Sequence, residues 1–152
     1  MKLFLMRHAE AKTLNHQDDR LRELTQKGIK EAEEVAAFLQ KYKIDKILVS
    51  NAVRTIQTGE IIYNKINSTK FEICPELYAS TSEDIIELIS RQQDQDKNIL
   101  VIAHNPGIFE AALELAHGSP EYESIVKNGM PTARIIKIEL DNISSWQNLI
   151  SF

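Results

Sequence analysis

Short apolar runs alternate along the chain with segments whose apolar residues recur three and four positions apart. An apolar run of about four to eight residues is typical of a buried strand, and the wider spacing is typical of a helix with one buried face. The pattern predicts strands at 2–6, 46–49, 71–74, 98–103 and 134–140, with a last strand at 146–150. It predicts helices from Thr25 to about residue 42, over 53–66, after Thr81 or Ser82, and from Asn105-Pro106 onward. Ser50 and Asn51 can cap the second of these helices, and Asn105 is the expected N-cap of the last.

Strands that alternate with helices predict an α/β fold, a three-layer α/β/α sandwich with a mostly parallel central sheet. The 152 residues contain no internal repeat and no Pro/Gly/Ser-rich linker, so we expect residues 1–152 to form a single domain. Ligands of such sheets bind beyond the carboxyl ends of the strands. The residues that directly follow each strand are therefore the first candidates for chemistry.

The composition narrows the possible classes of function. Hydrophobic residues make up 43% of the chain and charged residues 26%, with a formal net charge of −4, which is ordinary for a soluble globular domain. This mild acidity argues against a nucleic-acid binder. The lone cysteine, Cys74, excludes a disulfide framework and a cysteine-built metal site.

The sequence shows no targeting or membrane segment. The apolar start at residues 1–6 is shorter than the about 7–15 residues of a signal peptide's apolar region, and no stretch approaches the roughly 20 apolar residues that span a membrane. We therefore expect a cytoplasmic protein with no membrane partner.

Two arginines and two histidines follow three of the predicted strands. Arg7 and His8 end the first strand, Arg54 begins the helix after the second, and His104 follows the most hydrophobic strand. If these strands are neighbours, the four side chains converge. Guanidinium groups match the oxygens of a phosphoryl group, a neutral imidazole can attack phosphorus, and a second, protonated imidazole can stabilise the developing charge. We therefore expect phosphoryl transfer through a phosphohistidine intermediate, with no cofactor and no metal.

Other interpretations have less support. Four histidines without ligand spacing do not indicate a metal site, and the pair Asp18-Asp19 in a polar loop is typical of a solvated surface. A phosphate-accepting receiver domain needs an acidic pair after the first strand, where Arg7 and His8 lie. Two alternatives stay open, namely a broad small-molecule phosphomonoesterase and a phosphate-binding module without turnover.

Four segments, in order, resemble the motifs of the histidine phosphatase superfamily, which includes phosphoglycerate mutases. The segments at 5–11, 22–28, 49–58 and 101–106 resemble its Arg-His-Gly entry motif, its Arg-Pro-Leu-Thr-x-x-Gly segment, its Ser-x-x-x-Arg-x-x-Gln-Thr motif and its Val-x-His segment. The resemblance covers nearly the whole chain. It is strongest to the SixA type, the bacterial phosphohistidine phosphatases of signal transduction, and implies a phosphoglycerate mutase-like fold without a cap insertion.

The resemblance also implies a role for each matching residue. His8 would be the nucleophile that carries the phosphoryl group transiently, Arg7 and Arg54 would bind the phosphoryl oxygens, and His104 would complete the pocket. We expect His8 to be neutral, with its far ring nitrogen held by a backbone carbonyl, and we expect His104 to be protonated.

A further arginine is expected at the site. Arg22 matches an arginine that lines the site in some relatives, and Arg20 in the same loop is an alternative to it.

Two positions depart from the family pattern. Ala9 replaces a glycine, which adds a methyl group near the phosphate and disfavours a positive φ. Glu76 is the nearest match to the general acid of relatives that act on alkyl phosphates, but the glycine-containing sequence expected after it is missing. A phosphoramidate leaves as an imidazole, which is protonated without a dedicated acid. The resemblance therefore implies a phosphohistidine-bearing protein as substrate and partner.

Overall fold

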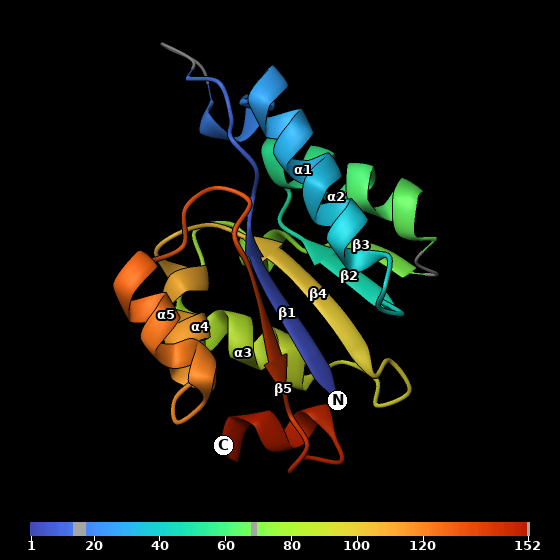
Figure 1. Cartoon of the computed structure of the whole chain (residues 1–152), viewed down its shortest axis with the longest axis vertical. Coiled ribbons are helices and arrows are strands. Elements are labelled where there is room, and N and C mark those ends of the chain that lie inside the picture. Colours follow the sequence, from blue (N-terminus) through green and yellow to red (C-terminus); the bar gives the residue numbers. More distant parts are fainter. Residues whose placement is uncertain (14–17, 68–69, 152) are drawn as a thin grey trace.

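The computed structural model describes residues 1–13, 18–67 and 70–151, which form a five-stranded sheet flanked by helices (Figure 1). The strands lie in the order β3-β2-β4-β1-β5, and each pairing is parallel except that of β5 with β1. Their bounds are β1 (Lys2–Arg7), β2 (Lys46–Val49), β3 (Lys70–Ile73), β4 (Asn98–Ala103) and β5 (Ile135–Glu139).

Helices cover both faces of this sheet. The α-helices are α1 (Gln26–Leu39), α2 (Val53–Ile66), α3 (Ser82–Ser90), α4 (Gly107–Leu115) and α5 (Pro120–Asn128). Short 3-10 helices are η1 (Asp19–Leu21), η2 (Pro75–Leu77) and η3 (Trp146–Ser151).

Alternation of side chains along the strands creates two hydrophobic cores, one on each face. Phe4 and Met6 of β1 lie in the core formed with α1 and α2, whereas Leu3 and Leu5 lie in the core formed with α3, α4, α5 and η3. The predicted three-layer sandwich with a mostly parallel sheet is confirmed. Within the described residues, β2 joins β3 through α2, and β3 joins β4 through η2 and α3, so these connections hold no cap insertion.

Three local predictions are wrong. The segment at 146–150 is not a strand but part of η3, because Trp146 and Leu149, three positions apart, both turn into the core. Asn105 does not cap α4, since Pro106 occupies the N-cap position and the Asn105 side chain donates to the Met130 carbonyl instead. The cap of α2 is Ala52, not Ser50 or Asn51.

Helix α5 was not expected from the apolar pattern. Of its nine residues only Ile125 is buried, and the apolar residues at helical spacing are just three, Tyr122, Ile125 and Val126. The signal present in the sequence was Ser119 followed by Pro120, an N-cap residue before a proline at the first helical position.

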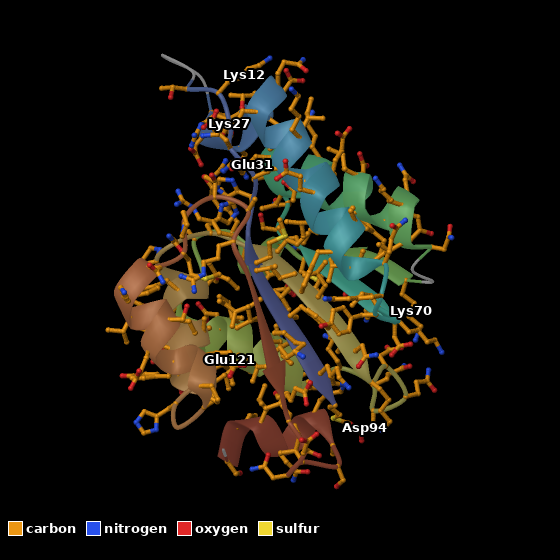
Figure 2. The ribbon with its side chains drawn as sticks, in the orientation of Figure 1. Lys12, Lys27, Glu31, Lys70, Asp94 and Glu121 are labelled. Carbon is orange, nitrogen blue, oxygen red and sulfur yellow. The ribbon has the colours of Figure 1, made fainter. Side chains whose placement is uncertain are left out.

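Glu31 of α1 forms hydrogen bonds with two loops that flank the carboxyl end of β1, the upper end in Figure 2. Its carboxylate accepts a hydrogen bond of 2.8 Å from the backbone N–H of Glu10, just after β1, and one of 3.3 Å from the Thr132 hydroxyl, just before β5. This single side chain therefore fixes the chain on both sides of the strand end that carries Arg7 and His8.

The described helices do not include one that is both long and apolar enough to cross a lipid bilayer.

We expect Trp146→Ala to lower the free energy of unfolding by about 3–5 kcal/mol, the usual range for truncating a buried aromatic side chain. Trp146 is fully buried, and its indole N–H donates to the Asp96 carbonyl at 2.7 Å. Urea unfolding followed by circular dichroism measures the change. Ile150→Ala is the matched control in the same 3-10 helix, because Ile150 is 62% exposed. Equal effects of the two substitutions would contradict the packing described for η3.

Candidate functional site

The sheet order brings the predicted residues to one place. β4 lies between β1 and β2, and their carboxyl ends are level, with Arg7 paired to Ala103 and Val49 to Ile102. His8 and His104 directly follow two of these strands, and their ring centroids are 5.3 Å apart. The guanidinium of Arg54, from the first turn of α2, contacts both rings. The four groups expected to converge from three strand ends therefore form one cluster.

His8 is a buried imidazole with a defined tautomer. Its Nδ1 lies 2.7 Å from the carbonyl oxygen of Ala9, which can only accept, so Nδ1 carries the proton. Burial, together with the charges of Arg54 and Arg7, lowers the pKa of His8 from 6.5 to about 4, although the Ala9 carbonyl acts in the opposite direction. The ring is therefore neutral near pH 7. Its Nε2 lone pair is directed at the Nε–H of Arg54, 3.3 Å away.

His104 is held in the opposite tautomer. Its Nδ1 lies 3.2 Å from Nη2 of Arg54, and a guanidinium can only donate, so this nitrogen accepts. The proton lies on Nε2 and is donated to the Ser50 hydroxyl at 2.6 Å, which in turn contacts Thr55 at 2.6 Å. Burial, followed by the charges of Arg54 and His8, lowers the pKa of His104 to about 3. The expectation that His104 is protonated is therefore wrong for this structure, because burial and the neighbouring Arg54 cation disfavour a second proton on the ring.

Arg54 is 5% exposed and has two hydrogen-bonding edges with different partners. On one edge, Nε and Nη2 donate to Nε2 of His8 and Nδ1 of His104. On the other edge, Nη1 and Nη2 donate to the carbonyl and carboxylate oxygens of Asp19, each at 2.9 Å. A cation at a helix N-terminus is unfavourable for the helix dipole, and here the Asp19 carboxylate offsets it.

Arg7 brings a second guanidinium to the cluster. Its Nη1 donates to the Met130 carbonyl at 3.2 Å, while its Nε is buried and has no hydrogen-bond partner among the described residues. Burial and the charges of Arg54 and Arg22 lower the pKa of Arg7. A buried unpaired donor costs free energy, and an oxyanion would satisfy it.

Ala9 fits the position where the resembling family motif has glycine. Among the described non-glycine residues, positive φ angles occur at Asn67, Ala79 and Ala133, so Ala9 adopts an ordinary backbone conformation. Its N–H donates to the Thr58 hydroxyl of α2 at 3.2 Å. The methyl group of Ala9 therefore introduces no backbone strain.

The remaining predicted residues lie at the rim. Arg22 donates to the Lys12 carbonyl at 2.7 Å and to Asp19 at 3.1 Å, and its charge contributes to the lowered pKa values of His8 and Arg7. Arg20 is exposed and pairs with Asp18 rather than with the cluster.

Glu76 is exposed on η2. In the described part of the chain its side chain makes no hydrogen bond with the imidazole and guanidinium cluster, and its role as an acid stays a prediction.

Two residues of the site were missed by sequence reasoning. The Asp19 carboxylate accepts from Arg54, Arg22 and the Tyr78 hydroxyl, the last at 2.8 Å. Partial burial opposes ionisation, yet these three donors hold the pKa of Asp19 well below its ordinary value. The Tyr78 ring also packs edge-on against His104 at 5.6 Å.

A signal for each was present. Asp19 precedes Arg22 by three positions in a polar loop, a spacing that suits an ion pair within one turn. Tyr78 lies five positions after the end of β3, which also ends at this edge, so extending the search past the short η2 helix would have included it.

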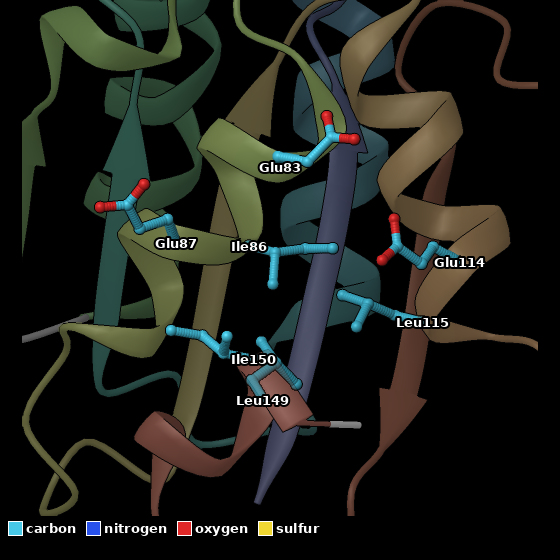
Figure 3. Close-up of a pocket in the computed structure, with 7 residues that line it drawn as sticks. All are labelled: Glu83, Ile86, Glu87, Glu114, Leu115, Leu149 and Ile150. Carbon is cyan, nitrogen blue, oxygen red and sulfur yellow. The ribbon is translucent and has the colours of Figure 1, made fainter.

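A separate groove of about 390 Å³ lies between α3, α4 and η3 (Figure 3). Three carboxylates and four aliphatic side chains line it: Glu83, Glu87, Glu114, Ile86, Leu115, Leu149 and Ile150. A lining with acidic but no basic side chains repels phosphate. The cluster at the strand ends is therefore the candidate site for phosphoryl chemistry.

We expect the free energy of unfolding to fall as the pH drops below about 6.5. Both imidazoles have folded-state pKa values below the ordinary 6.5, about 4 for His8 and about 3 for His104, so in this range the unfolded chain binds more protons. Each ring contributes a slope of up to about 1.4 kcal/mol per pH unit. Urea unfolding between pH 7 and pH 5 measures it. His104→Gln should flatten the slope and the exposed His117→Ala should not, and equal slopes in all three proteins would refute the assignment of buried, neutral rings.

Solved structures of other proteins share this architecture. A candidate phosphohistidine phosphatase SixA from Agrobacterium tumefaciens is 26% identical, with a TM-score of 0.79 over 90% of this chain and 89% of that chain. A protein histidine phosphatase SixA complexed with tungstate is 28% identical, with a TM-score of 0.77 over 95% and 92%. A candidate SixA from Nakamurella multipartitia, 22% identical, shares the fold with a TM-score of 0.82 over 97% and 88%. No curated protein sequence matches this chain.

The family model of the histidine phosphatase superfamily, branch 1, matches residues 3–81, more than half of the chain. The matched range contains Arg7, His8, Arg22 and Arg54, and His104 completes their cluster from outside it. The chain therefore belongs to the histidine phosphatase superfamily.

Proposed function

We propose that this protein is a phosphatase that removes the phosphoryl group from phosphohistidine on a partner protein, through a covalent phosphohistidine on His8. Membership of the superfamily supports the phosphatase class. The observation that carries the proposal is the neutral His8 ring, with its proton on Nδ1 and its Nε2 lone pair directed toward the buried guanidinium of Arg54.

His8 acts as the nucleophile in this proposal. Its Nε2 lone pair forms a bond to phosphorus while the bond between phosphorus and the substrate nitrogen breaks. The Ala9 carbonyl holds the Nδ1 proton and stabilises the positive charge that develops on the ring. Water then attacks the phosphorus of phosphorylated His8, which releases inorganic phosphate and restores the neutral ring.

The positive charge that this reaction needs comes from the arginines. As the phosphoryl group arrives, the Nε and Nη2 edge of Arg54 exchanges its imidazole partners for phosphoryl oxygens, and the unpaired Nε of Arg7 gains an acceptor. Guanidinium groups bind such oxygens in pairs. Arg22 adds charge at the rim, and His104 lines the pocket opposite His8.

Because arginines supply the positive charge in this proposal, chelators should leave turnover unchanged.

Phosphohistidine is favoured over an alkyl phosphate by its leaving group. An imidazole takes a proton from water readily, whereas an alkoxide needs an acid in the site. Glu76, the nearest sequence match to such an acid, is exposed on η2. The two solved structures reported above that are more than 25% identical to this chain are both described as SixA, and one of them is complexed with tungstate, a tetrahedral oxyanion like phosphate. A cytoplasmic protein that bears phosphohistidine is the substrate and partner that fits these features.

Acid-labile phosphate should appear on His8 when the protein is mixed with a phosphoramidate and quenched within milliseconds to seconds. His8→Ala should lose both this phosphate and all turnover, because Nε2 of His8 is the atom that bonds to phosphorus in this proposal. Mass spectrometry of the quenched protein identifies the modified residue. His117→Ala, on the surface, is the matched control and should behave as the wild type. Oxyanion binding by a wild-type protein that never becomes phosphorylated would favour the non-catalytic phosphate-binding module.

Glu76→Gln should leave the hydrolysis of protein phosphohistidine unchanged within about twofold, because the imidazole leaving group requires no dedicated acid. Rates on a phosphohistidine protein and on a sugar phosphate, measured with the wild type and the variant, test this. Faster turnover of the sugar phosphate by the wild type, together with its loss in Glu76→Gln, would favour the small-molecule phosphomonoesterase instead.

A further inference from the structure

The two edges of the Arg54 guanidinium suggest a role for a residue outside the family motifs. A guanidinium presents two planar pairs of donors, and each pair can bind one two-pronged acceptor. The Nε and Nη2 pair faces His8 and His104, where the proposed phosphoryl group sits. The Nη1 and Nη2 pair is taken by Asp19, through both its backbone carbonyl and its carboxylate, each at 2.9 Å.

Asp19 therefore binds Arg54 on the side of the guanidinium that faces away from the imidazoles. The Arg54 side chain is 6% exposed and the Asp19 side chain 48% exposed, so the aspartate lies between the buried cation and solvent. Two further donors fix the carboxylate: the Tyr78 hydroxyl at 2.8 Å and Nη1 of Arg22 at 3.1 Å. These contacts join three separate segments of the chain, α2, the loop around η1, and the residue after η2.

From this geometry we infer that Asp19 is a positioning residue of the phosphatase site, which holds Arg54 so that its Nε and Nη2 edge faces the phosphoryl group. The inference rests on the proposed function only in that a phosphoryl oxygen is taken as the ligand of that edge.

The physical reason is that an arginine side chain has several rotatable bonds. Without Asp19, the Arg54 side chain gains rotamers and its Nη1 and Nη2 pair can turn to solvent. At any time, fewer molecules then present the Nε and Nη2 pair to the phosphoryl group. Preorganised donors act most strongly on charge that develops in the transition state. Loss of Asp19 should therefore lower kcat and weaken oxyanion binding, although Asp19 itself touches no substrate.

If Asp19 instead competed with phosphate for Arg54, its removal would have the opposite effect on phosphate binding. A carboxylate that competed with phosphate for the same donors would weaken phosphate binding, and its removal would tighten it. Simple Coulomb repulsion between Asp19 and a bound anion acts in that direction too. The sign of the change therefore separates positioning from competition.

We expect Asp19→Ala to weaken the binding of inorganic phosphate by about tenfold or more, the usual effect of losing a hydrogen bond to a charged group. Asp19→Asn, which keeps an acceptor oxygen toward Nη2, should recover part of this loss. Isothermal titration calorimetry with phosphate gives the affinity, and steady-state kinetics on a phosphoramidate should show the larger change in kcat. Asp18→Asn is the matched control, because asparagine keeps the side-chain cap that Asp18 gives η1 while it removes an exposed charge next to Asp19, and it should stay within about twofold of wild type.

A double-mutant cycle tests whether Asp19 acts through Arg54. In the Arg54→Ala background, Asp19→Ala should change phosphate affinity by less than about twofold, since the group that it positions is gone. Equal effects of Asp19→Ala in both backgrounds would overturn the inference, and so would tighter phosphate binding by the single variant. Circular dichroism and thermal unfolding of each variant exclude loss of the fold as the cause.

The phosphate-binding measurement can distinguish a failure of this inference from a failure of the proposed function. A wild type that binds phosphate in an Arg54-dependent way but never turns over would end the enzymatic proposal, and the cycle would still decide the role of Asp19. A wild type whose phosphate binding does not depend on Arg54 would overturn both.

Discussion

The hydrogen bond between Nδ1 of His8 and the carbonyl of its own neighbour, Ala9, determines what the site can do. A carbonyl can only accept, so this 2.7 Å contact assigns the ring proton to Nδ1 and leaves a lone pair on Nε2. Burial and two nearby cations keep a second proton off the ring. Without this contact the imidazole could rotate or change tautomer, and the guanidiniums around it would face a nitrogen unable to form a new bond.

The sheet supplies the geometry on which that contact depends. Parallel pairing of β1 with β4 and of β4 with β2 places three chain segments at one edge, and the two cores hold the strands from either face. α2 adds Arg54 and also Thr55 and Thr58, which contact Ser50 and the backbone of Ala9. One helical turn thus positions the cation, supports the hydroxyl that orients His104, and anchors the loop that carries His8.

The sequence predicted the parts of this arrangement that follow from local chemistry or from periodicity. Alternating apolar runs predicted the parallel sheet, and the strand-end rule predicted the meeting of His8, Arg54 and His104. The protonation of His104 could not be predicted, because it depends on which nitrogen faces Arg54 and on the depth of burial, and both are set by packing. Asp19 was interpreted as a solvated surface residue for the same reason, since its partners Arg54 and Tyr78 are 35 and 59 positions away. Helix α5 holds few apolar residues, and the apolar positions Trp146, Leu149 and Ile150 fit a short helix as well as a strand.

Burial divides the site into two zones. His8, Arg54, Ser50, Thr55 and Thr58 are all buried, whereas Asp19 and Arg22 lie in surface loops. A substitution at one of the buried residues changes both the packing and the chemistry of the site, so these positions are under two constraints. Outer positions such as Arg20 and Leu21 can vary without cost to the core. The surface around the site can therefore change without moving the buried imidazole and guanidinium groups.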